Sequence, residues 1–394
     1  MLEGARQVGK TWLAKQFGAS RYQKVAYINM ENNQRMSALF SLDYDIERII
    51  RGLRAESRID IQHSDTLIIL DEIQEIPQAV ESLKYFQEHP TRYDVIAAGS
   101  FLGLTLHLNI SFPVGKVEFL QLKPLSFHEF LLAQQQVQLL EALQTLDYPL
   151  VQTFKTRYVE LLQTYFFVGG MPEVVSIYNE TQSWQATRDV QISLLDTYRR
   201  DLGKHAPSSL VPKIAQTWEN IPTQLAKENR KFIYGLIKQG ARAREYGAAL
   251  NWLSQAGLIY QIYRSTAPKF PINSYRDLQA FKIFTVDLGL LNALSGLGPE
   301  VLLMPDQVFT EFKGALTEQF VLQELKVFKN LPVSYWSGDK NSTAEVDFLI
   351  QTPNRIIPIE VKAKESLQSK SLKFFHQRFN SKISIRTSLS DFRQ

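Results

Sequence analysis

The sequence of 394 residues contains no cysteine. Disulfide bonds, thiolate metal sites and cysteine nucleophiles are therefore excluded, and we expect a cytoplasmic protein in a reducing compartment. The sequence also lacks a long apolar run, because no stretch approaches the roughly 18 residues that a membrane-spanning helix needs. Its N-terminus has no basic segment followed by an apolar one, so we expect neither a signal peptide nor a membrane partner.

The chain also has only a small excess of charge of one sign. The net charge is +4 and the isoelectric point is near 8.9, which permits contact with nucleic acid but does not argue strongly for it. Hydrophobic residues make up 44% of the chain and aromatic residues 11%, unlike a disordered protein. The length predicts two or three domains, each with a core of its own.

Residues 1–130 alternate between short, β-rich apolar runs and helical segments such as Ala79–Phe86. The expected strands are Lys24–Met30, Thr66–Leu70 and Tyr93–Ala98. This alternation predicts an α/β domain whose parallel sheet is covered by helices on both faces.

The rest of the chain divides into three regions. Residues 131–205 read as helical, with a break at Val168–Pro172. Residues 206–300 combine helices with a β-ribbon, which suggests a winged helix-turn-helix. Residues 301–394 read as a small α/β domain. The elements expected in the last two regions are the helices Leu210–Asn220, Ala241–Ala256 and Thr317–Phe328 and the strands Leu258–Tyr263, Val333–Trp336, Glu345–Ile350, Ile356–Val361 and Lys382–Ile385.

The first chemical motif lies at the start of the sequence and fits the pattern G-x-x-x-x-G-K-[ST] at every fixed position. Its members are Gly4, Ala5, Arg6, Gln7, Val8, Gly9, Lys10 and Thr11. The glycines let backbone N–H groups turn toward phosphates, and Lys10 supplies a cation for the β- and γ-phosphates. Thr11 offers a hydroxyl to Mg²⁺, and a helix over about Thr11–Phe17 points its positive end at the anion. The motif predicts binding of ATP and Mg²⁺.

The second motif is an aliphatic run, Leu67–Leu70, that ends in Asp71 and Glu72. In a P-loop protein, the Asp at the strand end anchors the Mg²⁺ shell, and the following Glu takes a proton from the attacking water. The alternative is that both residues only begin a solvated helix. Ser100 follows the third expected strand, where either a sensor of the γ-phosphate or a helix N-cap is expected.

One feature conflicts with the phosphate loop. A strand normally precedes such a loop, yet only Met1, Leu2 and Glu3 stand before Gly4. Burying about five apolar residues of that strand contributes roughly 8–15 kcal/mol, at ~1.5–3 kcal/mol each. We therefore expect the first strand to be missing from this sequence, for example through a misassigned start codon.

Together these motifs carry a family resemblance that covers nearly the whole chain. The chain resembles the bacterial AAA-type ATPases of the AAA+ superfamily that have a C-terminal domain of unknown function 4143. The stretches that carry the resemblance are GARQVGKTWLAKQF, INMEN, LIILDEIQEIP, AAGSFLG, FPVGKVEFLQLKPLSFHEFL, FVGGMPEVV, GALTEQFVLQEL, AEVDFLI and IPIEVKA. The resemblance implies that Gly4–Thr11 is the nucleotide loop, that Asp71 and Glu72 form the second motif, and that Ser100 is the sensor.

A second constellation lies near the C-terminus. Glu360 and Lys362 are two residues apart on an expected strand, so they share a face, and a hairpin would bring Asp347 beside them. Asp347 and Glu360 would hold Mg²⁺, Lys362 would orient or activate water, and Glu318 would add a ligand. This D…E-x-K pattern is typical of restriction-endonuclease-like folds, which the family's C-terminal domain resembles. Such a fold also occurs in proteins that only bind.

The middle region carries basic residues that suit either DNA reading or an ordinary solvated face. Gln224–Phe232 leads into Lys238, Arg242 and Arg244, near the second and third helices of the expected winged helix. Arg199 and Arg200 would act as arginine fingers if the chain forms a homo-oligomer, although arginines on helix surfaces are commoner.

The sequence thus predicts an ATP-binding protein that hydrolyses ATP with Mg²⁺ and couples the cycle to DNA or another partner. Three alternatives remain open: an ATP-dependent nuclease that uses the C-terminal carboxylates, a non-catalytic switch gated by nucleotide binding, and an inactive, truncated remnant.

Overall fold

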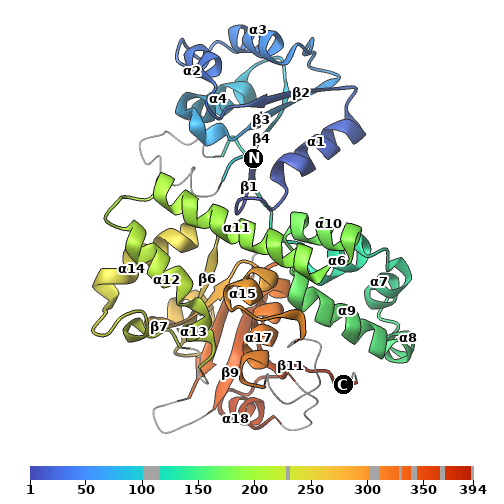
Figure 1. The fold of residues 1–394 in the computed structure, drawn as a ribbon, viewed down its shortest axis with the longest axis vertical. Helices are drawn as coiled ribbons and strands as arrows, with labels where there is room; N and C mark the ends of the chain where they lie inside the picture. The colour runs from blue at the N-terminus through green and yellow to red at the C-terminus, as the bar shows by residue number, and fades with distance from the viewer. Residues whose placement is uncertain are drawn as a thin grey trace. The chain divides into compact units, whose positions relative to one another are not determined.

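The computed structural model describes residues 1–100, 115–227, 231–300, 310–327, 331–338, 344–363 and 369–391 (Figure 1). The chain forms two compact units. The first comprises Met1–Lys123 and Gln255–Gly257, and the second comprises Pro124–Ser254 and Leu258–Gln394. None of the described helices is both long enough and apolar enough to cross a membrane.

The first unit is built on parallel strands that alternate with helices, as the sequence predicts. Its elements are β1 (Leu2–Glu3), α1 (Lys10–Arg21), β2 (Lys24–Asn29), α2 (Gln34–Phe40), α3 (Ile46–Ser57), β3 (Thr66–Asp71), α4 (Pro77–Glu88), β4 (Asp94–Ala97) and β5 (Leu120–Gln121). Strand β3 lies between β2 and β4 and is buried along its whole length. Strand β1 pairs in parallel with β5, and Leu2 forms a parallel bridge to Ala98, just beyond β4. The strands therefore follow the order β5-β1-β4-β3-β2.

Strand β1 precedes the phosphate loop. Only the two residues Leu2–Glu3 form it, and the expectation that a longer first strand is missing stays a prediction. Leu2 is only 7% exposed because it lies between two backbone partners, Ala98 on one side and Leu120 on the other. Backbone pairing on both sides holds this short segment where a longer apolar strand is normally needed.

Both faces of this sheet are covered. Ile68 and Leu70 pack into one core cluster with residues of α2, α3 and α4, whereas Leu67 and Ile69 pack into another with Ala14 of α1. The alternation follows from the period of two along a strand, which sends successive side chains to opposite faces. The predicted two-sided cover is confirmed.

The second unit begins with helices. They are α6 (Phe127–Ala133), α7 (Val137–Gln144), α8 (Tyr148–Thr153), α9 (Lys155–Val168), α10 (Pro172–Thr181), α11 (Trp184–His205), α12 (Val211–Glu219), α13 (Ile221–Leu225), α14 (Ala243–Gln255), α15 (Leu288–Leu294), α17 (Thr310–Val327) and α18 (Lys370–Phe379). The predicted break is confirmed, because α9 ends at Val168 and Pro172 opens α10.

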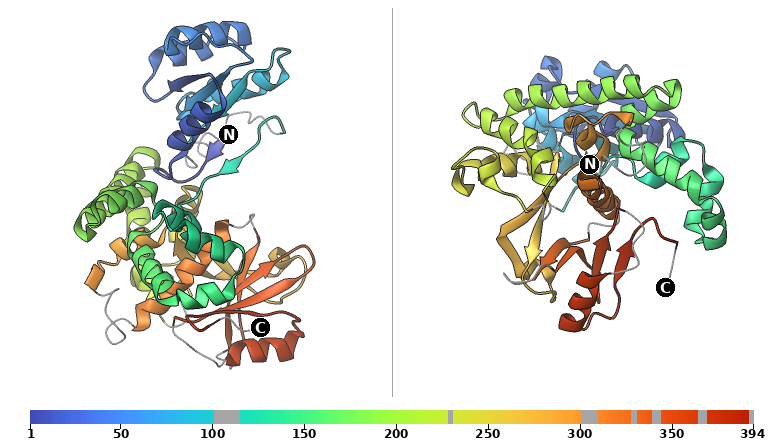
Figure 2. Two further views of the ribbon diagram at one scale, coloured as in Figure 1. Left: turned by 90° about the vertical axis from the view of Figure 1, so that its right-hand side faces the viewer. Right: turned by 60° about the horizontal axis from the view of Figure 1, so that its bottom comes forward.

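A mixed sheet completes the second unit (Figure 2). Its strands are β6 (Ile259–Ser265), β7 (Arg276–Thr285), β8 (Val333–Ser337), β9 (Glu345–Gln351), β10 (Ile356–Val361) and β11 (Ile385–Thr387). Among the described residues they form one sheet in the order β11-β10-β9-β8-β6-β7. Helix α18 covers one face, where Leu372 and Phe375 pack with Trp336 and Leu349. The last strand lies at Ile385–Thr387 instead of the expected Lys382–Ile385.

This sheet crosses the domain boundary that the sequence predicts between residues 300 and 301. Strands β6 and β7 form the antiparallel ribbon expected of a wing, but β6 also pairs in parallel with β8 through Arg264 and Tyr335. The ribbon is therefore part of the C-terminal sheet. Local sequence patterns do not reveal this pairing, because Arg264 and Tyr335 lie about 70 residues apart and no turn joins their strands.

A buried carboxylate ties the helices to this sheet. Gly169 has a φ of 75° and ends α9, and the N–H of Gly170 donates to Asp287 Oδ2 at 2.7 Å. Asp287 Oδ1 accepts from the N–H of Leu290 at 2.9 Å and so caps α15. Burial raises the pKa of Asp287, whereas these N–H donors act to lower it. A Cβ added to Gly170 would lie 2.1 Å from the carbonyl oxygen of Leu125.

We predict that Gly170→Ala lowers the free energy of unfolding of the second unit by about 1–3 kcal/mol, the usual range for overpacking. Gly247→Ala is the control, because it lies within α14 and its added Cβ would meet nothing within 4 Å. That change should stabilise the protein by up to ~1 kcal/mol. Urea denaturation followed by tryptophan fluorescence measures both, since Trp184, Trp218, Trp252 and Trp336 lie in this unit. Equal midpoints for Gly170→Ala and wild type would contradict the tight turn.

Candidate functional site: a phosphate loop and its carboxylates

The predicted phosphate loop runs from the end of β1 to the start of α1. Its backbone takes left-handed conformations at Gln7 (φ 62°) and Gly9 (φ 90°), and Gly9 is the N-cap of α1. Gly4 has a φ of 149°, and a Cβ there would lie 2.3 Å from the carbonyl oxygen of Leu122. Both glycines of the motif are thus required by backbone geometry. The loop lies at the carboxyl end of β1, where the chain crosses to the far edge of the sheet, which is the usual ligand position in open α/β sheets.

Lys10 is 7% exposed although it is a lysine. Its ammonium donates to the carbonyl oxygens of Ala5 at 2.9 Å and Gly4 at 3.2 Å. Burial lowers the pKa of Lys10, and the nearby carboxylates of Glu72 and Asp71 oppose that shift. The loop therefore holds a desolvated cation next to two acidic side chains.

Asp71 ends β3 and is 4% exposed. Its Oδ2 accepts a hydrogen bond from the Thr11 hydroxyl at 2.7 Å and another from the Tyr27 hydroxyl at 3.0 Å. Burial, and then the charge of Asp71, raise the pKa of the Tyr27 phenol, so Tyr27 remains a donor. The two predicted motifs, 60 residues apart in sequence, therefore meet at one carboxylate oxygen.

Glu72 lies directly after β3, in the left-handed region at φ 50°. Its N–H donates to Asp71 Oδ1 at 3.2 Å, and its own Oε2 accepts from the Gln74 amide at 2.5 Å. Ser100 is buried just beyond β4, the strand that lies between β1 and β3. The sheet order thus brings all three predicted groups to the carboxyl ends of neighbouring strands.

Two contributors were missed by the sequence analysis. Tyr27 lies on β2 opposite Ile69, and the Lys15 ammonium lies 3.5 Å from its ring centroid. Gln74 is 2% exposed and holds Glu72. The sequence gives only a weak signal for Tyr27. Tyr27 and Asn29 are the aromatic and polar residues near the end of β2, and the neighbouring strand β3 ends in Asp71.

The residues present fit Mg²⁺. Thr11 Oγ1 and Asp71 Oδ2 are hard oxygen donors held 2.7 Å apart, and Mg²⁺ is usually bound by one or two protein oxygens together with substrate phosphates. Thr11 and Asp71 would therefore hold the ion, directly or through its waters. Elsewhere in the described residues, no three His, Asp or Glu side chains are grouped so as to bind a metal.

The C-terminal constellation is only partly assembled. Strands β9 and β10 form the predicted hairpin, in which Ile359 pairs with Phe348. Asp347 Oδ2 accepts from the N–H of Val361 at 2.7 Å. Glu360 is 3% exposed, forms a 2.9 Å ion pair with Lys362 and accepts a hydrogen bond from Ser369. Asp347 thus binds to β10 beside Glu360, as the hairpin predicts.

Glu318, the fourth predicted member, has a different ion-pair partner. Its Oε2 lies 3.4 Å from Lys282 Nζ on β7, and Lys282 also forms a 2.5 Å pair with Glu345 on β9. Lys282 is 1% exposed and faces the Tyr335 ring at 5.1 Å. The predicted set of three carboxylate ligands is therefore not brought together among the described residues. Lys282 could not be predicted as this partner, because the sequence places its region in a domain separate from Glu318 and Glu345.

The basic residues of the middle region lie at the surface. Lys238 and Arg242 are exposed before α14, Arg244 is exposed in its first turn, and residues 228–230 lie outside the described residues. Arg199 pairs with Asp196 at 3.0 Å and with Glu219 at 3.7 Å within the same chain. No partner chain is present, so the arginine-finger expectation stays a prediction.

We predict that Thr11→Val destabilises the first unit by about 1–3 kcal/mol, because a buried carboxylate loses a hydroxyl donor. Thr11→Ser, which keeps the hydroxyl, should stay near wild type. Tyr27→Phe should cost a similar amount, and the double variant should cost more than the sum, since each single variant leaves one donor on the shared oxygen and the double variant leaves neither. Amide hydrogen exchange of β2 and β3 reports these changes, and strictly additive effects would contradict the shared acceptor.

Family models match three parts of the chain. Residues 1–131 match the family model described as an AAA domain, residues 159–301 match a domain of unknown function numbered 8612, and residues 313–394 match the domain of unknown function 4143. No curated protein sequence matches the chain.

Solved structures include two similar chains of low identity. The Walker-type ATPase PABY2304 of Pyrococcus abyssi has a TM-score of 0.44 and 15% identity over 74% of this chain and 89% of its own. The Aeropyrum pernix ORC1 protein, solved in complex with DNA, has a TM-score of 0.29 and 15% identity over 75% of this chain and 85% of its own. The chain therefore combines an N-terminal region that matches an AAA domain with a C-terminal region that matches the domain of unknown function 4143.

Proposed function

We propose that this protein binds ATP with Mg²⁺ at the Gly4–Thr11 loop and hydrolyses the γ-phosphate. The observation that carries the proposal is the 2.7 Å hydrogen bond from Thr11 to Asp71, because it joins the phosphate loop to the carboxylate that a metal-bound triphosphate requires. The match of residues 1–131 to an AAA domain supports it.

In this proposal each residue of the site has one role. The backbone N–H groups of Ala5 to Gly9 and the start of α1 surround the phosphates. Lys10 turns its ammonium from the carbonyl oxygens of Gly4 and Ala5 to the β- and γ-phosphate oxygens, which offer the desolvated cation a formal negative charge. Mg²⁺, when bound, neutralises developing charge on the phosphates.

Glu72 is the proposed general base. Glu72 directly follows Asp71, the proposed metal ligand, and its carboxylate accepts a hydrogen bond from the Gln74 amide. The two neighbouring carboxylates therefore have separate roles in this proposal. Glu72 would accept a proton from the water that attacks the γ-phosphorus. Ser100, buried between the ends of β1 and β3, would donate its hydroxyl to the γ-phosphate.

We propose further that the nucleotide cycle changes how the second unit contacts DNA or a protein partner. The exposed cations Lys238, Arg242 and Arg244 support DNA as that partner. The nuclease alternative is weaker, since Lys282 engages Glu318 and no three-carboxylate group exists in the described part of the chain.

Lys10→Ala should weaken Mg²⁺-dependent ATP binding by about a hundredfold or more, because two charge-assisted hydrogen bonds of ~1.5–3 kcal/mol each are lost. Calorimetry on the full chain measures the affinity. Arg21→Ala is the control, as Arg21 is exposed on the same helix, roughly 16 Å farther along at 1.5 Å per residue. Unchanged binding by Lys10→Ala would remove the loop from the proposal.

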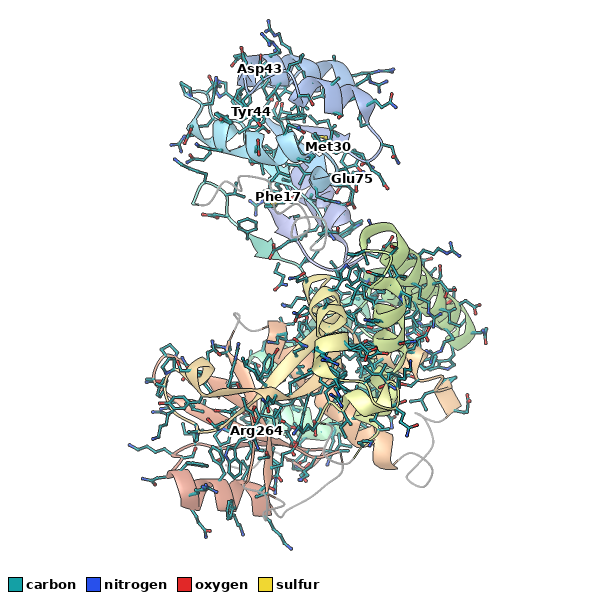
Figure 3. All side chains as sticks on the ribbon, turned by 90° about the vertical axis from the view of Figure 1, so that its left-hand side faces the viewer. Phe17, Met30, Asp43, Tyr44, Glu75 and Arg264 are labelled. Atoms are coloured by element: carbon teal, nitrogen blue, oxygen red, sulfur yellow. The ribbon has the colours of Figure 1, made fainter. Side chains whose placement is uncertain are left out.

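Glu72→Gln should bind ATP with near wild-type affinity and lose hydrolysis by about 10²- to 10⁴-fold, the contribution of a general base. Phosphate release under saturating ATP measures turnover. The matched control is Glu75→Gln, three residues along the chain (Glu75 is labelled in Figure 3), which should retain activity. Full turnover by Glu72→Gln would assign the base to another group.

A further inference from the structure

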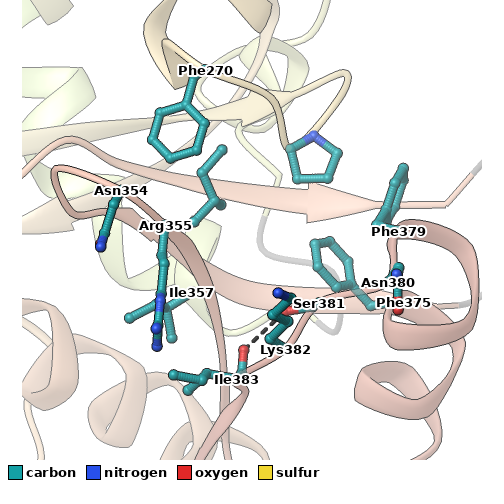
Figure 4. A pocket seen from close by; sticks show the side chains of 12 residues that line it. Phe270, Asn354, Arg355, Ile357, Phe375, Phe379, Asn380, Ser381, Lys382 and Ile383 are labelled. Carbon is teal, nitrogen blue, oxygen red and sulfur yellow. Dashed lines mark hydrogen bonds between the residues drawn. The ribbon is translucent and has the colours of Figure 1, made fainter.

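A basic pocket lies on the C-terminal sheet and is lined by none of the residues assigned to the sites described above (Figure 4). It has a volume of about 320 Å³ and is formed by three segments: the β6–β7 connection, the β9–β10 turn, and the end of α18 with the loop that follows it. Arg355 and Asn354 lie on one side, Phe375 and Phe379 on the other, and Lys382 between them.

The charge of these segments has one sign. Residues 266–276, 352–359 and 369–390 contain no Asp or Glu, and they carry eight cationic residues: Lys269, Arg276, Arg355, Lys370, Lys373, Arg378, Lys382 and Arg386. The whole chain has a net charge of +4, so the remainder carries −4. Two of these cations, Arg355 and Lys382, line the pocket itself, and the other six lie in the segments that form it or continue from it.

The two cations in the pocket wall are not used by the fold. Arg355 and Lys382 are both exposed, and neither forms an ion pair with any described residue. The nearby polar groups are amides and a hydroxyl: Asn354, Asn380 and Ser381. A pocket with guanidinium, ammonium and amide donors and no carboxylate favours an anion with several oxygens.

Aromatic and aliphatic side chains complete the pocket. Phe270 is 48% exposed and Ile383 is 40% exposed, which is unusual for side chains of this size. Cations along a groove with accessible aromatic rings are the combination that binds single-stranded nucleic acid, since phosphates pair with the cations and bases stack on the rings.

A lipid surface fits less well. A basic helix that binds membranes presents its apolar face to the lipid. The apolar face of α18 is already used, because Leu372 and Phe375 are buried against Trp336 and Leu349. An acidic peptide would use the cations, but it would leave the exposed Phe270 ring without a stacking partner.

We propose that this pocket binds single-stranded nucleic acid, with Arg355 and Lys382 on phosphates and Phe270 stacked on a base. The site is independent of ATP hydrolysis and is tested without nucleotide, so the failure of either proposal leaves the other standing.

The test measures fluorescence anisotropy of a labelled oligothymidylate of about 16 nucleotides, the upper range for small single-strand-binding folds. Wild-type protein should bind it. Arg355→Glu combined with Lys382→Glu should weaken binding at least tenfold, and the slope of log K against log salt should become shallower by about 1.4, at ~0.7 for each lost phosphate contact. Phe270→Leu, which keeps an apolar side chain but removes the ring, should weaken binding between about fivefold and a hundredfold with an unchanged salt slope.

The matched control is Arg51→Glu combined with Lys84→Glu, the same charge change on exposed residues of α3 and α4 in the first unit. This control should bind as wild type does. No binding by wild type, or equal losses in the two double variants, would overturn the site. Polyglutamate that competes as well as unlabelled oligothymidylate would overturn its assignment to nucleic acid.

Discussion

One carboxylate oxygen, Asp71 Oδ2, holds the first unit's site together. It accepts hydrogen bonds from the Thr11 hydroxyl on α1 and the Tyr27 hydroxyl on β2, so α1, β2 and β3 meet at this oxygen. The burial of β3 places this oxygen at the sheet edge with little access to water, which strengthens each hydrogen bond and makes an unpaired oxygen costly. The geometry of the loop follows, because Thr11 is fixed directly after Lys10 and Gly9.

The second unit treats its charges in two ways. Inside, they are matched: Lys282 lies between Glu318 and Glu345, and Asp287 is satisfied by the N–H groups of Gly170 and Leu290. At the pocket, Arg355 and Lys382 are exposed and form no ion pair with a described residue. The buried charges fix the positions of these helices relative to the strands, because a buried charged group has few alternative partners. Arg355 and Lys382 have no such ion-pair partners, which leaves both side chains available for binding.

The sequence allowed the phosphate loop, the Asp71–Glu72 pair, the strand positions of the first unit and the β9–β10 hairpin to be predicted, because each depends on local pattern and spacing. The short strand Leu2–Glu3 was not predicted, since its stability comes from partners about 100 residues away. The pairing of β6 with β8 and the position of Lys282 also escaped, because no local periodicity states which distant strand a ribbon joins. For the same reason, the grouping of eight cations was invisible in the net charge.

The junction between β6 and β8 has a mechanical consequence. Strands β6 and β7 are paired at seven positions, whereas β6 and β8 are bridged only at Arg264 and Tyr335. Two strands resist sliding past one another more strongly when more backbone hydrogen bonds join them. The junction between β6 and β8 is therefore weaker than the pairing within the β6–β7 hairpin. The ion pair between Lys282 on β7 and Glu345 on β9 connects the two sides of this junction. Under tension the two halves of the sheet would part there first, each keeping its own hairpin intact.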